Sequence, residues 1–240
     1  MKKTLVFLLI GALLAGLALP VFAQKDDPLL TLVNPWNTIP QDWKVDLVSV
    51  GNGHKVDKTC YNDLVAMLDA CKAAGFRPVV RSSYRTQATQ KQLYENKVNQ
   101  WKGYGYAEEE ARKQAAAIVA PPGTSEHQLG WAVDLVDASY QVLNEKQATM
   151  PAQKWLMEHS WEYGFILRYP VNKSDVTGII YEPWHYRYVG REHAKAIYES
   201  GLCLEEWLEQ RNTLLTVKNA IRAQAEALCG KTIALQWYKP

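Results

Sequence analysis

Two short stretches decide how this chain folds: SEHQLGWAVD at residues 125–134 and EPWH at residues 182–185. The first carries His127 and Asp134, and the second ends in His185. Two imidazoles and one carboxylate are the open ligand set of a catalytic zinc, which leaves a fourth position for water. Glu182 is then a carboxylate near the metal that is not needed as a ligand, as a general base should be. The alternative is a buried polar group that is satisfied by hydrogen bonds alone.

Both stretches lie in strand-like segments that are surrounded by helical patterns. Residues 132–136 form a buried run that ends at a second carboxylate, Asp137, and residues 179–189 alternate past Pro183, which indicates an edge or a bulge. Further strands are expected over 45–50, 77–81 and 165–169. Helices are expected over 57–74, 87–101, 107–118, 151–163, 191–199 and 203–229, the last ending at Gly230. The pattern predicts an α+β fold in which a small antiparallel sheet carries the site and is flanked by helices.

Three other histidines lack a carboxylate or cysteine at metal-binding spacing. His54 follows a Gly-Asn-Gly turn and is expected in an exposed loop. His159 falls inside an expected helix, as a packed or surface imidazole, and His193 is expected on the surface. The predicted metal site is therefore restricted to the two stretches quoted above.

The first 23 residues have the pattern of a leader rather than of a globular domain. Lys2 and Lys3 precede an apolar run that reaches about Leu19, and small residues follow up to Ala23. We expect a secretory signal peptide over 1–23, a catalytic domain over 24–210 and a C-terminal helical extension over 211–240. An uncleaved N-terminal membrane anchor is the alternative. Either way the protein is expected to be secreted or in the cell envelope, outside the cytoplasmic membrane.

The composition of the chain is that of a folded domain with balanced charge. Nearly half of the residues are apolar, at 48%, and nine Trp and thirteen Tyr are present. The 27 basic residues include the two lysines of the leader, so their removal leaves basic residues equal in number to the 25 acidic ones. A neutral chain gives no electrostatic reason for binding nucleic acid. We expect no nucleic-acid or protein partner, and a monomer.

Four cysteines follow the leader: Cys60, Cys71, Cys203 and Cys229. An oxidising compartment permits disulfides. Cys60 and Cys71 share one expected helix and would lie about 16 Å apart along it, too far for a bridge. We expect a bridge from this helix to the C-terminal region, with buried free thiols as the alternative.

Three segments together resemble the signature of a known peptidase family. SSYRT at 82–86, SxHxxGxAxD at 125–134 and ExWH at 182–185 resemble those of VanY-like D-alanyl-D-alanine carboxypeptidases. These belong to a wider group of zinc peptidases that includes L,D-carboxypeptidases, lysostaphin-like enzymes and the hedgehog domain. The resemblance covers roughly residues 35–210 and has Ser83 where the family usually has glycine. Cys60 and Cys203 both lie within it, so we favour them as the bridged pair.

The resemblance implies a role for each of the residues above. His127, Asp134 and His185 would bind zinc, and Glu182 would activate the water. Arg85 would face the scissile carbonyl or the terminal carboxylate of the substrate, for which its planar fork is suited. A structural ion pair is the alternative for Arg85.

Four further residues correspond to positions that contact the terminal D-alanine in similar enzymes: Gln90, Ser125, Tyr169 and Trp184. For Ser125 the alternative is a turn cap, and for the two aromatic residues it is packing in the core.

The implied activity is a zinc-dependent removal of the C-terminal D-alanine from peptidoglycan stem peptides. The first alternative is an L,D-carboxypeptidase or a peptidoglycan endopeptidase on the same fold. The second is a non-catalytic, zinc-stabilised binding module, as in the hedgehog domain. Glu182 beside His185 speaks against the second, because a purely structural site needs neither a base nor an open coordination position.

Overall fold

The computed structural model describes residues 27–236, with side chains described up to residue 225. The chain divides into two units, one of residues 29–216 and one of residues 1–28 together with 217–240. The expected signal peptide over 1–23 lies outside the described residues. No helix within 27–236 is both long and apolar enough to cross a membrane.

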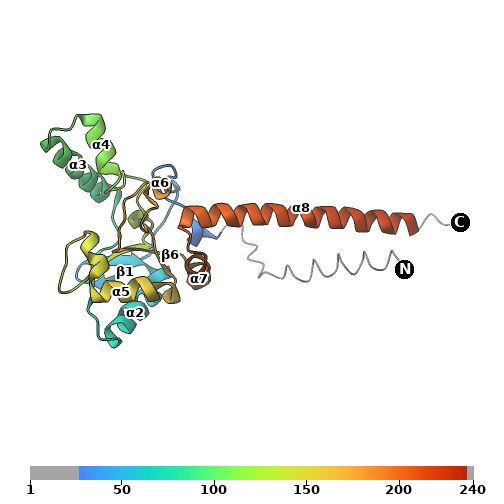
Figure 1. The fold of residues 1–240 in the computed structure, drawn as a ribbon, viewed down its shortest axis with the longest axis horizontal. Coiled ribbons are helices and arrows are strands. Elements are labelled where there is room, and N and C mark those ends of the chain that lie inside the picture. Colours follow the sequence, from blue (N-terminus) through green and yellow to red (C-terminus); the bar gives the residue numbers. More distant parts are fainter. Residues whose placement is uncertain (1–26, 237–240) are drawn as a thin grey trace. The chain divides into compact units, whose positions relative to one another are not determined.

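A four-stranded antiparallel sheet is the framework of the 29–216 unit (Figure 1). Its strand order is β3 (Pro78–Ser82), β4 (Ala132–Asp137), β6 (His185–Tyr188) and β5 (Phe165–Leu167). Every residue of β4 is buried, as expected for a central strand. A separate hairpin joins β1 (Leu47–Gly51) to β2 (His54–Asp57). The predicted α+β class with a small antiparallel sheet is confirmed.

The helices follow the predicted segments closely. They are α2 (Lys58–Ala73), α3 (Gln87–Gly103), α4 (Glu108–Ala116), α5 (Pro151–His159), α6 (Ser174–Thr177), α7 (Arg191–Ser200) and α8 (Leu204–Gln236). Four short 3-10 helices are η1 (Pro28–Leu30), η2 (Glu126–Leu129), η3 (Glu145–Thr149) and η4 (Ser160–Tyr163). The predicted end of the last helix at Gly230 is wrong, because α8 continues to Gln236. A glycine inside a helix costs only about 1 kcal/mol relative to alanine and does not by itself end one.

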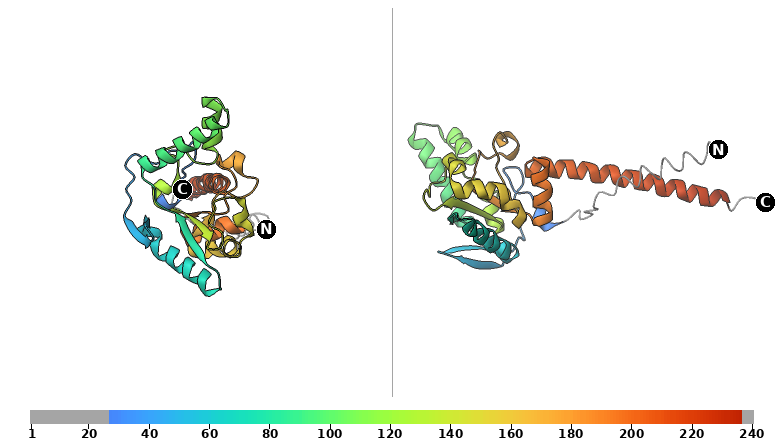
Figure 2. Two further views of the ribbon diagram at one scale, coloured as in Figure 1. Left: turned by 90° about the vertical axis from the view of Figure 1, so that its left-hand side faces the viewer. Right: turned by 60° about the horizontal axis from the view of Figure 1, so that its bottom comes forward.

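The core lies between the sheet and the helices α2 and α5. Four residues of α2 are buried, and they pack in one cluster with Leu129, Val133 and Leu135 and with α5: Cys60, Leu64, Met67 and Cys71. Asp57 is the N-cap of α2, and its side chain accepts a hydrogen bond from the Thr59 amide. Helices α3 and α4 pack on each other through a small cluster of their own. In Figure 1 and both views of Figure 2 this α3–α4 pair lies at one end of the unit and α2 at the other.

Three local predictions were wrong. The alternating segment 179–189 is a strand only from His185, because the chain turns at Glu182, whose carbonyl accepts a hydrogen bond from the His185 amide. His54 lies in β2 rather than in a loop, with its Nδ1 3.2 Å from the Ser83 hydroxyl. His193 is buried rather than exposed, because α7 turns it toward Trp207, at 5.7 Å between ring centroids.

The predicted disulfide between Cys60 and Cys203 is also wrong. Cys60, Cys71 and Cys203 are buried free thiols, and the Cys60 Sγ donates to the carbonyl oxygen of Asp57 at 3.3 Å. Burial, with the nearby Asp57 carboxylate, raises the pKa of the Cys60 thiol to about 12. The side chain of Cys229 lies outside the described residues. The thiols that the structure describes therefore behave as small core residues.

Candidate metal centre

Three neighbouring strands place the key side chains in one row. Asp134 on β4 is the direct partner of His185 on β6, and on its other side it pairs with Ser82 of β3. Directly opposed residues of antiparallel strands project from the same face of the sheet. The sheet register therefore brings two residues 51 positions apart in the sequence into contact, with His185 Nδ1 3.1 Å from Asp134 Oδ1.

His127 reaches the same place through the 3-10 helix η2 and the glycine that ends it. Gly130 has φ +80°, and a Cβ there would lie 2.5 Å from a methyl carbon of Val45. Only glycine combines that backbone conformation with that space. The Arg85 amide donates to the carbonyl oxygen of His127 at 3.1 Å, which fixes η2 beside the end of β3.

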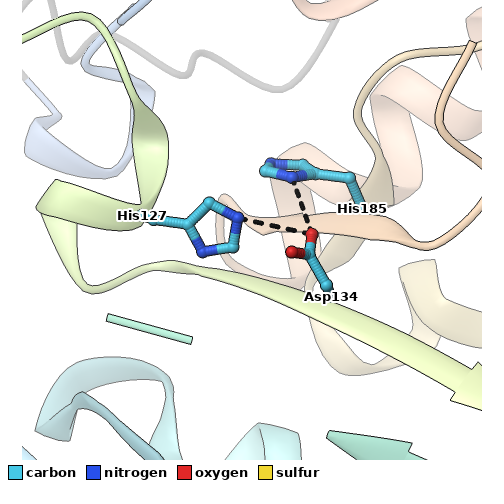
Figure 3. A group of neighbouring side chains, drawn as sticks. All are labelled: His127, Asp134 and His185. Carbon is cyan, nitrogen blue, oxygen red and sulfur yellow. Dashed lines mark hydrogen bonds and ion pairs between the residues drawn. The ribbon is translucent and has the colours of Figure 1, made fainter. Parts of the chain in front are cut away.

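The three predicted ligands form one compact group (Figure 3). One ligand atom from each of His127, Asp134 and His185 can be chosen so that all lie within 4.8 Å of one another, and all three residues are buried. His127 Nε2 lies 3.3 Å from Asp134 Oδ1. The two rings are nearly perpendicular, at 89°. Figure 3 shows both imidazoles turned toward the one carboxylate.

The protonation of His127 fits a metal ligand. Its Nδ1 lies 2.8 Å from the carbonyl oxygen of Ser83, which can only accept, so Nδ1 carries the hydrogen and Nε2 keeps its lone pair. Burial and the Arg85 guanidinium lower the pKa of His127 to about 4, although Asp134 opposes them. Because Ser83 acts here through its backbone, the serine in place of glycine does not alter this contact. Two imidazoles and a carboxylate in a buried group fit zinc.

Glu182 lies beside this group without being part of it. Its Oε2 is 3.7 Å from His185 Nδ1, and the side chain is buried. Burial raises the pKa of Glu182 to about 8, a rise that His185 opposes and the Asp134 charge increases. A glutamate with a raised pKa holds a proton more strongly than an exposed one, as a group that takes a proton and later returns it requires.

Arg85 is both an ion-pair partner and part of the pocket wall. Its Nη2 lies 2.9 Å from Asp134 Oδ2, and its Nε and Nη2 donate to the Ser82 hydroxyl at 3.0 and 2.7 Å. Its Nη1 lies at the limit of hydrogen bonding, 3.4 Å from Gln90 Oε1. Arg85 therefore makes a structural ion pair and also lines the pocket, where Nη1 is the nitrogen with donor capacity to spare.

A pocket of about 210 Å³ opens onto the metal group. Ser125, Tyr169 and Trp184 line it together with Arg85 and Glu182. The Ser125 side chain makes no capping hydrogen bond, so its turn-cap alternative is not supported. Gln90 is fully buried and lies behind Arg85, where its Nε2 donates to the Ala120 carbonyl at 2.7 Å. It is not among the residues that line the pocket, so its position favours support of the wall over substrate contact.

Lys97 and Glu126 are charged residues near the site that were not predicted. Lys97 of α3 lines the pocket, but a lysine within a charged helix carries no sequence signal that separates it from a solvated face. Glu126 is completely buried, and the charges of Arg168 and Arg187 hold its pKa far below the usual range although burial opposes them. Its place next to His127 in the sequence was no usable signal, because its carboxylate contacts His185, 59 positions away.

The comparisons agree with this geometry. The VanY family model, described as D-alanyl-D-alanine carboxypeptidase, matches residues 53–191. A D-alanyl-D-alanine carboxypeptidase of Enterococcus faecalis is 45% identical over 180 residues, which cover 75% of this chain and 65% of the relative. The match therefore spans slightly less than two thirds of that relative's length.

Two solved structures extend the comparison. One is a mutant of the vancomycin-resistance D,D-pentapeptidase VanY in complex with Zn(II), at 43% identity and a TM-score of 0.70, covering 76% of this chain and 99% of that one. The other is the LD-carboxypeptidase LdcB, at 35% identity and a TM-score of 0.66, covering 75% and 86%. With the family model matching more than half of the sequence, the chain belongs to the VanY family of D-alanyl-D-alanine carboxypeptidases.

Proposed function

We propose that this protein is a zinc-dependent carboxypeptidase that removes the C-terminal D-alanine from peptidoglycan stem peptides. The observation that carries the proposal is the buried group of His127, Asp134 and His185 at a pocket whose wall also holds Glu182 and Arg85. The family membership and the zinc complex of the VanY relative support it. A non-catalytic module would not need a buried carboxylate with a raised pKa beside the ligands.

Each residue has a distinct part in the proposed hydrolysis. Zinc held by His127, Asp134 and His185 supplies the Lewis acidity that lowers the pKa of water and polarises a peptide carbonyl. Glu182 accepts the proton that the attacking water loses and delivers it to the amine of the departing D-alanine. Arg85 binds an anionic oxygen, either of the substrate carboxylate or of the oxyanion that forms at the scissile carbon.

The pocket wall also contains two aromatic residues. The Tyr169 ring packs on His185 at 4.7 Å between centroids, and Tyr169 and Trp184 are both almost fully buried. Their apolar surfaces leave room for a small side chain such as the methyl group of alanine. A bound substrate that displaces water from this buried site would strengthen the interactions of the charged groups around the bond.

The proposal is tested with purified protein and synthetic tri-, tetra- and pentapeptide stems, with products read by mass. Conversion of the pentapeptide to the tetrapeptide with release of one alanine is expected, and a chelator should abolish it. An intact pentapeptide in the presence of zinc would contradict the proposal.

An L,D-carboxypeptidase is the second candidate, favoured by the similarity to LdcB. The same assay separates the two activities, because an L,D-enzyme converts the tetrapeptide to the tripeptide. An endopeptidase would instead cleave cross-linked dimers, which are added as a further substrate.

The remaining expectations about the whole protein stay proposals. They comprise a signal peptide over 1–23, a catalytic domain over 24–210, a helical extension over 211–240 and a monomeric state. We propose that the protein acts outside the cytoplasmic membrane, where its substrate lies. N-terminal sequencing of material recovered from the envelope and the medium tests the cleavage after Ala23.

A further inference from the structure

A second carboxylate approaches His185, at the ring nitrogen that does not face Asp134. Glu126 is completely buried, and its Oε2 lies 3.4 Å from Nε2 of His185. The other ring nitrogen of His185, Nδ1, is the one that faces Asp134 Oδ1. His185 is therefore held between two carboxylates, one at each nitrogen.

Glu126 is itself fixed by two buried arginines. Its Oε1 accepts from Arg168 Nε at 2.7 Å and from Arg187 Nη1 at 2.8 Å, and both guanidinium groups are fully buried. Arginine does not lose its proton in proteins, so the carboxylate between these two charges is anionic and can only accept hydrogen bonds. One oxygen of Glu126 is thus committed to the arginines, and the other is available to His185.

The arginines are held in turn by parts of the chain far from the site. Arg187 Nη2 donates to the carbonyl oxygens of Leu29 and Thr31, at 3.0 and 2.9 Å. Arg168 makes two hydrogen bonds to the carboxylate of Glu205 in the first turn of α8, at 2.8 and 2.6 Å. The position of Glu126 is consequently defined by the N-terminal segment, by β6 and by α8 together.

We propose that Glu126 is a positioning residue for His185. By accepting the Nε2 hydrogen, it fixes the tautomer and the orientation of the ring so that the Nδ1 lone pair faces the metal site. His127 has the corresponding arrangement, with the Ser83 carbonyl oxygen at its Nδ1 and Nε2 left for the metal. A hydrogen-bonded partner on the outer nitrogen of a ligating histidine fixes its tautomer and raises its basicity. The inference rests on the proposed metal centre.

The test compares Glu126→Gln with Glu205→Gln. Both changes remove one carboxylate charge from Arg168, but only the first alters a group that touches His185. Glutamine has a single acceptor oxygen, so at position 126 it can serve the arginines or His185 but not both. The dissociation constant for zinc, measured by competition with a chromophoric chelator, should rise about 10- to 100-fold in Glu126→Gln. In Glu205→Gln it should stay within about twofold of wild type. An equal change in both variants would overturn the inference.

Two further measurements cover the case in which Glu126→Gln does not fold. Glu126→Asp keeps the charge between the arginines but draws the carboxylate back from His185, so zinc binding should again weaken; unchanged affinity would count against the inference. In wild type loaded with zinc, ¹⁵N NMR of the imidazoles should place the His185 hydrogen on Nε2. A hydrogen on Nδ1 would refute the positioning role directly. Failure of the wild type to bind zinc would instead remove the proposed metal centre, which separates the two outcomes.

Discussion

The substitution Arg85→Lys tests whether the guanidinium does more than hold Asp134. Lysine keeps the positive charge, so the ion pair to Asp134 can be retained at the end of a flexible chain. Lysine loses the planar guanidinium group, whose N–H donors point in several fixed directions. A single ammonium group cannot donate to Ser82 and Asp134 and also place a donor where Nη1 of Arg85 lies. Removal of one oriented donor to a developing oxyanion costs on the order of 10²–10³-fold in rate, about 2.7–4 kcal/mol. We expect a loss of that size in kcat/KM.

The assay follows hydrolysis of a pentapeptide stem ending in D-alanine and of the same stem ending in D-alaninamide. If Arg85 binds the terminal carboxylate, wild type prefers the free acid and the variant loses that preference through a higher KM. If Arg85 stabilises the oxyanion, kcat falls for both substrates. Arg81→Lys is the matched control, because Arg81 lies exposed on β3, shortly before Arg85 in the chain.

Retention of full activity by Arg85→Lys on both substrates would refute this reasoning. The Asp134 ion pair would then be the whole role of Arg85. Zinc content is determined on the same samples, because a loss of metal would place the effect on Asp134 rather than on the substrate.

Three other predictions follow from the structure. Gly130→Ala should lower the free energy of unfolding by about 2–5 kcal/mol in urea titrations, because the new Cβ would have a left-handed backbone and lie 2.5 Å from a Val45 methyl carbon. The control Gly75→Ala, at φ +91° in open space, should lower it by only about 1–2 kcal/mol. Protein purified without added metal should contain one zinc per chain by elemental analysis, and Asp134→Ala should contain little; a metal-free wild type that gains neither zinc nor activity on titration would contradict the site. Cys60, with its raised pKa, should react with a thiol reagent only after denaturation, and fast reaction of the native protein would show that the site of this thiol is open.

The sequence was most informative where one periodicity accounts for a whole element. Cys60, Leu64, Met67 and Cys71 repeat at helical spacing, and they are the buried face of α2. The buried run at 132–136 likewise became the central strand β4. In both places a single physical cause, burial against the core, sets the residue pattern.

The sequence was least informative where a turn or a tertiary contact overrides the local pattern. Alternation over 179–189 resembles a strand, but the hydrogen bond between the Glu182 carbonyl and the His185 amide makes a turn that carries the proposed base to the ligands. His193 appears polar and exposed in the sequence, yet the fold buries it against Trp207 of α8. The burial of His193 depends on an aromatic residue of another helix, which the pattern of its own helix does not reveal.

In the candidate site, too, some residues could be predicted from the sequence and others could not. The residues for the metal group were identified by type and spacing, and the sheet register that joins Asp134 to His185 explains why they meet. The role of Glu126 was not predicted, because its buried position depends on ion pairs with Arg168 and Arg187, which lie 42 and 61 positions away in the sequence. Buried charge networks are therefore visible only when the fold is known.

The most direct test of the account is Glu182→Gln, assayed on a D-Ala-D-Ala-terminated stem peptide with zinc measured on the same samples. The amide preserves the shape of the side chain but cannot accept the proton. We predict a loss of about 10²–10⁴-fold in kcat, roughly 3–5 kcal/mol of transition-state stabilisation, with zinc content and KM little changed. Full activity in the variant would dismiss Glu182 as the base, and loss of zinc together with activity would make it a ligand instead.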